Sequence, residues 1–393
     1  MKTIAILGTL DTKGEEHAFL AELVRQRGHQ PLLIDAGTQG EPTVNLDVAR
    51  SQLIGEQSFS DRGEAVAAMA EAVAVFCAKL VAEKKIDGII SLGGGGGTAI
   101  GTAAMRALPV GFPKLMVSTL AASESAPSYM GVKDVTMMPS IVDVAGLNRI
   151  SRPIFANAAG AICGMVESAV PVAEDKPVIV ASMFGNTTDC VNHAKGLLEA
   201  AGYEVLIFHA TGTGGRTMES LIEAGLVAGV LDVTTTEWAD EHVGGILGAG
   251  PARLEAAARN GLPTVIAPGC LDMVNFGEPK SVPAKFEGRN FYHHNPQVTL
   301  MRTSIDECAA LGKILAEKIN LSTGPVTVLL PLSGISVISQ PDGPFHAATA
   351  DAALFDTLKS YLRDDIAVQE IDCAINDPRF AEVAARALLD QLG

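Results

Sequence analysis

Short apolar runs alternate with longer stretches of helical periodicity along most of the chain. Such runs predict buried strands, and strands that alternate with helices form parallel sheets covered by helices on both faces. A chain of 393 residues also exceeds what one hydrophobic core usually organises. The sequence therefore predicts an α/β protein with two Rossmann-like, doubly wound domains, mainly parallel sheets and a cleft between the domains. The expected strands cover residues 4–7, 31–34, 86–91, 114–118 and 135–138 in the first half, and 178–183, 205–208, 228–232, 264–267, 326–330 and 366–370 in the second.

A charged, proline-containing stretch at residues 172–177 marks the expected domain boundary. It separates an N-terminal nucleotide-binding domain, residues 1–175, from a C-terminal domain, residues 176–393. Residues 28–40 and 202–214 resemble each other and have matching glycines at both ends. Either a duplication or the shared pattern of Rossmann-like units accounts for this similarity.

Five consecutive glycines at residues 93–97 follow one expected strand and precede a helical pattern. Main-chain N–H groups in such a loop can approach a phosphate because no Cβ intervenes, and the helix dipole adds partial positive charge. We therefore expect Gly94, Gly95, Gly96, Gly97 and Thr98 to bind nucleotide phosphates. The alternative is a tight strand-to-helix turn without a ligand.

The loop after the first expected strand is also polar, although it matches neither the Walker A pattern nor GxGxxG. Thr9, Thr12 and Lys13 could donate hydrogen bonds to a phosphate, while Asp11 could hold magnesium or a ribose hydroxyl. No other metal site is expected. The alternative is a polar loop that caps the following helix.

Two further segments near the glycine run carry polar side chains. Ser123 and Ser125 lie in a hydroxyl-rich loop, and Asp143 follows the last strand expected in the first half. These groups could contact phosphate, sugar or base. The hydroxyls could instead solvate a long loop or cap a helix.

The second half contains another glycine turn between a strand and a helix, with Arg216 beside it. Arginine, glycine amides and threonines suit a carboxylate or phosphate. A tight turn with an exposed arginine is the alternative.

Residues 268–302 are expected to form a long functional loop or an intersubunit arm. Within this segment Arg289 and His293 are the candidate catalytic residues. His293 and His294 are adjacent, so on extended chain at most one of them faces a given site. We expect an acidic second ligand in the cleft between the domains, bound by Thr211, Gly212, Gly214, Arg216, Asn275, Arg289, His293 and Arg302.

The chain has 29 basic and 45 acidic side chains and a formal net charge of −16. This balance disfavours direct binding to nucleic acid and to anionic membranes, whereas a small anionic ligand needs only a local donor-rich pocket. The six cysteines include no CxxC pair, which disfavours a zinc knuckle or a disulfide scaffold. The first residues enter a strand directly, and no long uninterrupted apolar stretch occurs. We expect a cytoplasmic protein.

Several long motifs resemble the Tm-type ATP-binding domain family, which is related to the N-terminal domain of the tomato mosaic virus resistance protein. The resemblance rests on residues 8–15, 92–98, 138–148, 272–277, 289–296 and 375–377. It extends over essentially the whole chain, and only the fifth glycine of residues 93–97 departs from the pattern. The resemblance implies two Rossmann-like subdomains, ATP bound with magnesium by the N-terminal one, and a homodimer.

The leading expectation is thus an ATP-binding protein with a second, acidic ligand. Some relatives are fused to a barrel that resembles phosphoenolpyruvate-utilising enzymes, which favours an alternative: an ATP-dependent enzyme of small-carboxylate metabolism. A third hypothesis is a regulatory module whose dimer surface engages a protein in response to ATP. We do not expect this acidic chain to share the antiviral role of the plant relative.

Overall fold

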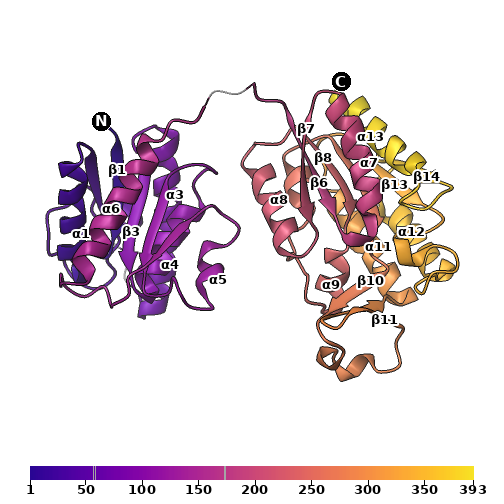
Figure 1. The fold of residues 1–393 in the computed structure, drawn as a ribbon, viewed down its shortest axis with the longest axis horizontal. Coiled ribbons are helices and arrows are strands. Elements are labelled where there is room, and N and C mark those ends of the chain that lie inside the picture. The colour runs from indigo at the N-terminus through magenta and orange to yellow at the C-terminus, as the bar shows by residue number, and fades with distance from the viewer. Residues whose placement is uncertain (56, 58, 172–173) are drawn as a thin grey trace. The chain divides into compact units, whose positions relative to one another are not determined.

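The computed structural model describes residues 1–55, 57, 59–171 and 174–393. The chain divides into two compact units, Met1–Val172 and Ala173–Gly393 (Figure 1). We call them the N-terminal unit and the C-terminal unit. Of the boundary stretch expected at residues 172–177, residues 172 and 173 lie outside the described residues.

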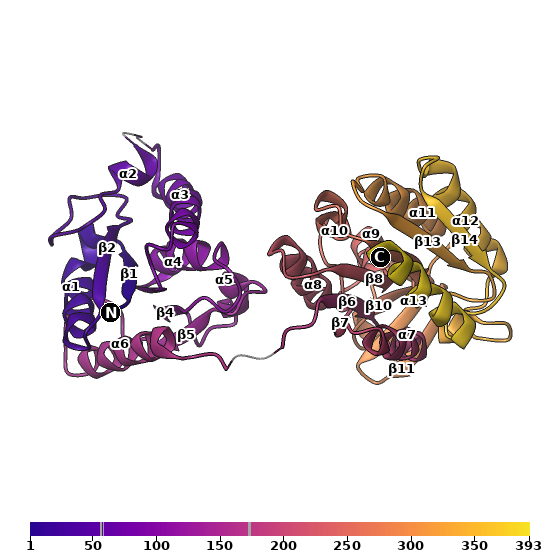
Figure 2. The ribbon, with the colours of Figure 1, turned by 90° about the horizontal axis from the view of Figure 1, so that it is seen from above.

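The N-terminal unit is built on a five-stranded parallel sheet with the order β2-β1-β3-β4-β5. Its strands are β1 (Thr3–Gly8), β2 (Gln30–Asp35), β3 (Gly88–Gly93), β4 (Lys114–Ser118) and β5 (Thr136–Pro139). Its helices are α1 (Leu10–Gln26), α2 (Ser51–Ile54), α3 (Arg62–Ala82), α4 (Gly95–Arg106), α5 (Ala126–Met130) and α6 (Ser151–Glu167). Figure 2 shows α1 and α6 on one face of the sheet and α3 and α4 on the other, and each pair shares an apolar core with the strands.

Helix α3 is long and apolar enough, by length and composition alone, to cross a membrane. Core helices of globular proteins pass the same test. The buried residues of α3 recur about every four positions, which is the spacing of one helical face packed on a core. They are Ala65, Met69, Val73, Cys77 and Leu80.

The C-terminal unit contains a six-stranded parallel sheet with the order β14-β13-β9-β8-β6-β7. The strands are β6 (Val178–Met183), β7 (Glu204–His209), β8 (Gly229–Thr234), β9 (Thr264–Gly269), β13 (Val326–Pro331) and β14 (Ala367–Ile371). One face is covered by α7 (Thr188–Ala200) and α13 (Pro378–Leu392). The other face is covered by α8 (Thr213–Glu223), α10 (Glu255–Arg259), α11 (Ile305–Ile319) and α12 (Ala348–Tyr361). A short helix α9 (Glu237–Val243) follows β8.

These sheets confirm the predicted α/β class, and each expected strand overlaps a strand of the structure. The expectation of a long loop at residues 268–302 is corrected. This segment forms a three-stranded antiparallel sheet with the order β10-β12-β11, together with two single 3₁₀ turns. The strands are β10 (Met273–Phe276), β11 (Phe291–Asn295) and β12 (Val298–Arg302). Such short strands are stable only when paired, so their local pattern is weak.

The turn from β1 into α1 depends on a close approach between Gly8 and His17. A Cβ at Gly8 would lie 2.0 Å from Nε2 of His17, which is fully buried. The imidazole thus occupies the space that a side chain at residue 8 would need.

We predict that Gly8→Ala lowers the free energy of unfolding by about 1–3 kcal/mol, because the added methyl overpacks the core. The matched control is Gly164→Ala on α6, where a Cβ meets nothing within 4 Å. That change should leave stability unchanged or raise it by up to about 1 kcal/mol, through helix propensity. Urea unfolding of both variants tests this, and equal stabilities would contradict it.

Candidate functional site

The strand order of the N-terminal sheet reverses between β1 and β3. In open parallel sheets, ligands bind beyond the carboxyl ends of the strands at such a reversal. The loops that follow β1 and β3 are the polar loop with Lys13 and the glycine run. Two of the predicted loops therefore meet at the position where this fold class places its ligands.

The glycines of the run have different roles. A Cβ at Gly93 would lie 2.8 Å from the Cα of Gly97, so close packing of strand and helix requires Gly93. A Cβ at Gly95 would meet nothing within 4 Å. A tight turn thus explains Gly93 but leaves Gly95 unexplained, whereas a ligand close to the main chain would explain it.

Helix α4 begins at Gly95, and its N-cap Gly94 has no side chain with which to cap it. Among the described residues no side chain accepts a hydrogen bond from the N–H of Gly95, Gly96 or Gly97. The first N–H groups of a helix need external acceptors and favour anions. The start of α4 therefore presents unpaired donors at the edge of the sheet.

A recess of about 240 Å³ opens at this helix start. It brings together residues that were expected from three separate loops: Thr9, Asp11, Thr12, Lys13, Gly94, Gly95, Gly96, Gly97 and Asp143. Thr38, Gln39 and Arg62 also line it. Thr38 and Gln39 follow β2, so their loop lies at the same carboxyl edge of the sheet as the loops after β1 and β3. Arg62 begins α3, and no local sequence motif indicates that it lines the recess.

Lys13 and Asp11 give the recess its charged groups. Lys13 interrupts α1 with φ −134° and ψ 29°, and its ammonium donates a hydrogen bond to the carbonyl of Val144. Asp11 Oδ2 accepts from the N–H groups of Gln39 and Gly40, at 3.0 and 3.1 Å. Asp11 Oδ1 is buried and has no hydrogen-bond partner within the part of the chain that the structure describes.

That unpaired oxygen fits a magnesium ion bound together with phosphates, because such ions take one or two carboxylates plus phosphate oxygens. A metal ion held by protein side chains alone would need at least three such ligands. Within residues 1–55, 57, 59–171 and 174–393, no group of three or more His, Cys, Asp and Glu side chains is arranged to hold a metal ion.

Three expected residues do not line the recess. Thr98 is fully buried, and its Oγ1 lies 2.6 Å from Oγ of Ser118 at the end of β4. Ser123 and Ser125 are exposed and bond to each other, with 2.8 Å between their Oγ atoms. We therefore remove all three from the candidate contacts, because local partners take up their hydroxyls.

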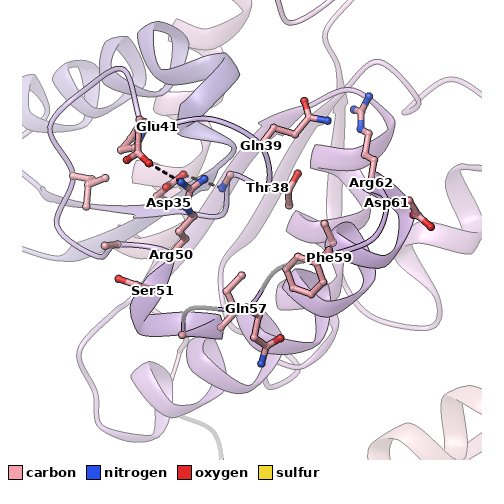
Figure 3. A pocket seen from close by; sticks show the side chains of 17 residues that line it. Asp35, Thr38, Gln39, Glu41, Arg50, Ser51, Gln57, Phe59, Asp61 and Arg62 are labelled. Atoms are coloured by element: carbon pink, nitrogen blue, oxygen red, sulfur yellow. Dashed lines mark hydrogen bonds and ion pairs between the residues drawn. The ribbon is translucent and has the colours of Figure 1, made fainter.

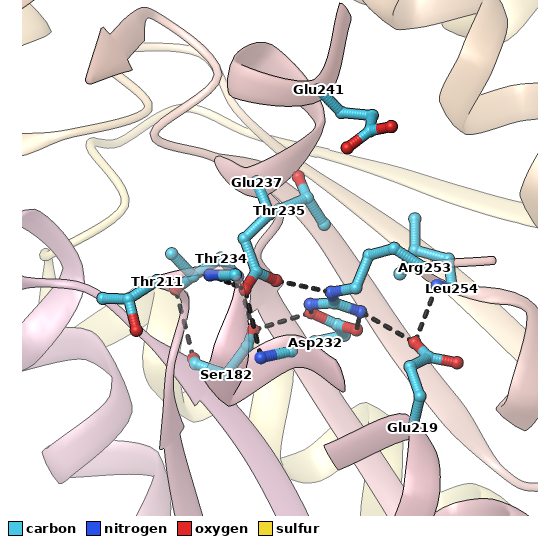
Figure 4. A network of polar contacts seen from close by, with 12 residues as sticks. Ser182, Thr211, Glu219, Asp232, Thr234, Thr235, Glu237, Glu241, Arg253 and Leu254 are labelled. Atoms are coloured by element: carbon cyan, nitrogen blue, oxygen red, sulfur yellow. Dashed lines mark hydrogen bonds and ion pairs between the residues drawn. The ribbon is translucent and has the colours of Figure 1, made fainter. Parts of the chain in front are cut away.

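The second glycine turn differs from the first because a side chain of the protein itself occupies it. Glu237 Oε1 accepts hydrogen bonds from the N–H groups of Gly212 and Gly215, at 2.7 and 3.0 Å (Figure 4). A Cβ at Gly215 would lie 2.1 Å from this carboxylate, and one at Gly214 would lie 1.7 Å from the carbonyl of His209. The turn alternative therefore accounts for this loop. Arg216 and Thr211 are exposed beside it.

Glu237 belongs to a network around Arg253, which is 2% exposed. Arg253 bonds Asp232 through two nitrogens at 2.5 and 2.7 Å, Glu237 at 2.7 Å and Glu219 at 3.1 Å. Burial lowers the pKa of Arg253, but the surrounding carboxylates, Asp232 first, outweigh burial and raise it well above its usual value. The network fixes the start of α8 from within the protein (Figure 4).

Three more of the residues expected to bind an acidic ligand have internal partners. Asn275 donates to Asp240 at 2.7 Å. Arg289 forms a two-bond ion pair with Glu307, at 2.6 and 3.0 Å. Buried Arg302 binds Asp351 and the carbonyl of Phe345.

The two histidines lie on the edge strand β11 and are exposed. His293 lines a mainly apolar recess of about 270 Å³, together with Val282, Phe291 and Thr299. This lining does not suit an acidic ligand, because it supplies no arginine or lysine.

We predict that Arg253→Met destabilises the protein by about 3–5 kcal/mol, because it leaves three carboxylates without their buried cation. Arg216→Met, on the exposed side of the same loop, should change stability by no more than about 0.5 kcal/mol. Urea unfolding measures both. Similar losses in the two variants would show that the network does not hold this loop.

The stability of the protein should depend on pH through the buried carboxyl group of Asp272. Asp272 is fully buried after β9, and its Oδ2 accepts from Ser336 Oγ at 2.7 Å. Burial raises the pKa of Asp272 from 3.8 to about 6. The folded state therefore holds this proton more tightly than the unfolded chain, and the resulting stabilisation is present below pH 4 and is lost as the pH rises through 6.

Asp272→Asn cannot titrate, so the stability of the wild type relative to this variant should fall by roughly 2 kcal/mol between pH 4 and pH 7. Urea unfolding at intervals of half a pH unit measures this difference. A difference that stays constant across the range, or that rises, would contradict a raised pKa.

Comparisons with known proteins identify relatives over nearly the whole chain. Residues 2–171 match the N-terminal domain of the uncharacterised protein family UPF0261, and residues 176–392 match its C-terminal domain. The chain is 48% identical to a UPF0261 protein of Clostridium tetani, over 100% of this chain and 99% of the relative. It is 36% identical to the ToMV resistance protein Tm-1(GCR237) of Solanum lycopersicum, over 98% of this chain and 55% of that protein.

Among solved structures, UDP-GlcNAc 2-epimerase from Neisseria meningitidis bound to UDP-GlcNAc aligns with 100% of this chain and 99% of its own, at 10% identity and a TM-score of 0.26. A similarity of this size says nothing about ligands. The two domain matches and the relatives together place the chain in its family: it belongs to UPF0261.

Proposed function

We propose that the N-terminal unit binds ATP with magnesium and that the phosphates lie over the main-chain N–H groups of Gly95, Gly96 and Gly97. The observation that carries the proposal is the recess in which these unpaired donors meet Lys13 and the unpaired oxygen of Asp11. Few anions other than a polyphosphate with its metal ion would use both a row of amides and a free carboxylate oxygen.

Local chemistry supports this assignment despite the net charge of −16. Amide donors at a helix start attract an anion without carrying formal charge, and Lys13 and Arg62 add cationic groups to the same recess. Magnesium held by Asp11 would neutralise part of the phosphate charge. The resemblance to Tm-type ATP-binding domains points to the same ligand class.

We propose no acidic second ligand at the second glycine turn or at Asn275, Arg289 and Arg302, because side chains of the protein itself already bind these groups. We propose no catalytic role for Arg289, because Glu307 holds its guanidinium. We also propose a homodimer, from the family resemblance, and a cytoplasmic location, from the composition.

We predict that Gly95→Asp weakens magnesium-ATP binding at least tenfold, because it places bulk and negative charge over the amides. The protein should still fold, since a Cβ at this position has open space. Isothermal titration calorimetry measures the affinity, and a thermal melt checks the fold.

The charge-matched control is Ser123→Asp, which adds the same charge on an exposed loop outside the recess. Its ATP affinity should stay within about twofold of the wild type, because solvent and salt screen exposed charges. A folded Gly95→Asp variant with unchanged affinity would reject the phosphate assignment.

A further inference from the structure

A second, larger recess of about 640 Å³ lies beside the first. Thr38, Gln39 and Arg62 line the larger recess (Figure 3), and the same three residues also line the smaller one. Small-molecule sites usually enclose about 300–1,000 Å³. The smaller recess is below that range, so it suits the phosphates alone, whereas the larger one has room for the rest of a nucleotide.

Asp35 ends β2 and lines the larger recess, yet it is only 1% exposed. Its Oδ1 accepts from the N–H groups of Leu10 and Gly37, at 3.2 and 2.8 Å. No group among the described residues donates a hydrogen bond to Oδ2. Asp35 is thus a nearly buried carboxylate with one oxygen committed to the fold and the other without a partner.

Asp35 and Asp11 both contact the turn at Gly37. A Cβ there would lie 2.8 Å from Cγ of Asp11 and 2.9 Å from Oδ1 of Asp35. Asp11 lines the smaller recess and Asp35 lines the larger one. Two carboxylates therefore lie against one turn, each lining a different recess and each with an oxygen that no described residue pairs.

The walls of the larger recess indicate what it would take. Leu46 and Ile54 supply apolar surface. Arg50 is already bonded to the carbonyl of Gly40 and to Glu41, so it offers little to a further anion. Glu41 and Asp61 also line the recess and would repel one. Arg62 lies on the wall that the two recesses share, where it serves the phosphates of the smaller one. The rest of the lining fits an uncharged group with an apolar face and hydroxyl donors, and not a second phosphate.

We propose that this recess binds the nucleoside part of the ligand and that Oδ2 of Asp35 accepts hydrogen bonds from the ribose hydroxyls. The proposal rests on the proposed function, because the triphosphate in the smaller recess directs the nucleoside into the larger one. It assigns the protein to ribonucleotides in preference to nucleotides without these hydroxyls. Burial raises the pKa of Asp35, and hydrogen bonds from hydroxyl groups would stabilise the charged carboxylate against this effect.

The test compares three ligands by isothermal titration calorimetry with magnesium: ATP, 2′,3′-dideoxy-ATP and inorganic tripolyphosphate. The wild type should prefer ATP over the dideoxy nucleotide by about tenfold or more, since hydrogen bonds to a charged group are the stronger ones. Asp35→Asn keeps an acceptor for Leu10 and Gly37 and replaces the unpaired oxygen by an NH₂ group. It should lower that preference at least about threefold and leave tripolyphosphate affinity unchanged.

Glu41→Gln is the matched control, because it removes the same charge from the same recess where the carboxylate is exposed and paired with Arg50. It should retain the wild-type preference. Equal affinities of the wild type for ATP and the dideoxy nucleotide would overturn the ribose assignment whether or not the variants fold. So would an unchanged preference in Asp35→Asn. If tripolyphosphate still binds in either case, the phosphate site of the proposed function is retained and only the ribose assignment is rejected. If neither ATP nor tripolyphosphate binds the wild type, the proposed function fails as well.

Discussion

Main-chain N–H groups at the start of a helix require acceptors, and the two glycine turns of this protein meet that requirement in opposite ways. At α8, the buried carboxylate of Glu237 supplies the acceptor and Arg253 neutralises it. At α4, no side chain of the described residues does so, and the donors face a recess. This difference decides which turn can take an external anion and which is a closed part of the fold.

A similar contrast separates three arginines of the C-terminal unit from two aspartates of the N-terminal unit. In the C-terminal unit, Arg253, Arg289 and Arg302 are paired with carboxylates, which makes them structural groups. In the N-terminal unit, Asp11 and Asp35 each use one oxygen to hold a turn, and the other oxygen accepts no hydrogen bond from any described residue. Unpaired groups that are nearly buried cost stability, so their presence beside two recesses favours a ligand that completes them.

The loops that line the N-terminal recess could be grouped from the sequence because the fold class sets their location. Residues after β1 and β3 must meet at the carboxyl edge of a parallel sheet, so Thr9, Lys13 and Gly95 could be grouped before any contact was known. The sequence did not show the internal partners of Arg289 and Arg302, because a guanidinium that binds a ligand and one that binds Glu307 or Asp351 look alike in sequence. The short strands β10 to β12 were missed because antiparallel pairing, and not local periodicity, stabilises them.

The sequence by itself determined the class of fold, the positions of the main strands along the chain and the position of a loop rich in main-chain donors, because apolar periodicity and glycine act locally. Only the tertiary structure decided whether those donors were already bonded. That outcome depends on residues far apart in the chain, such as Gly212 and Glu237, or Asp11 and Gln39, which packing alone brings within hydrogen-bond distance.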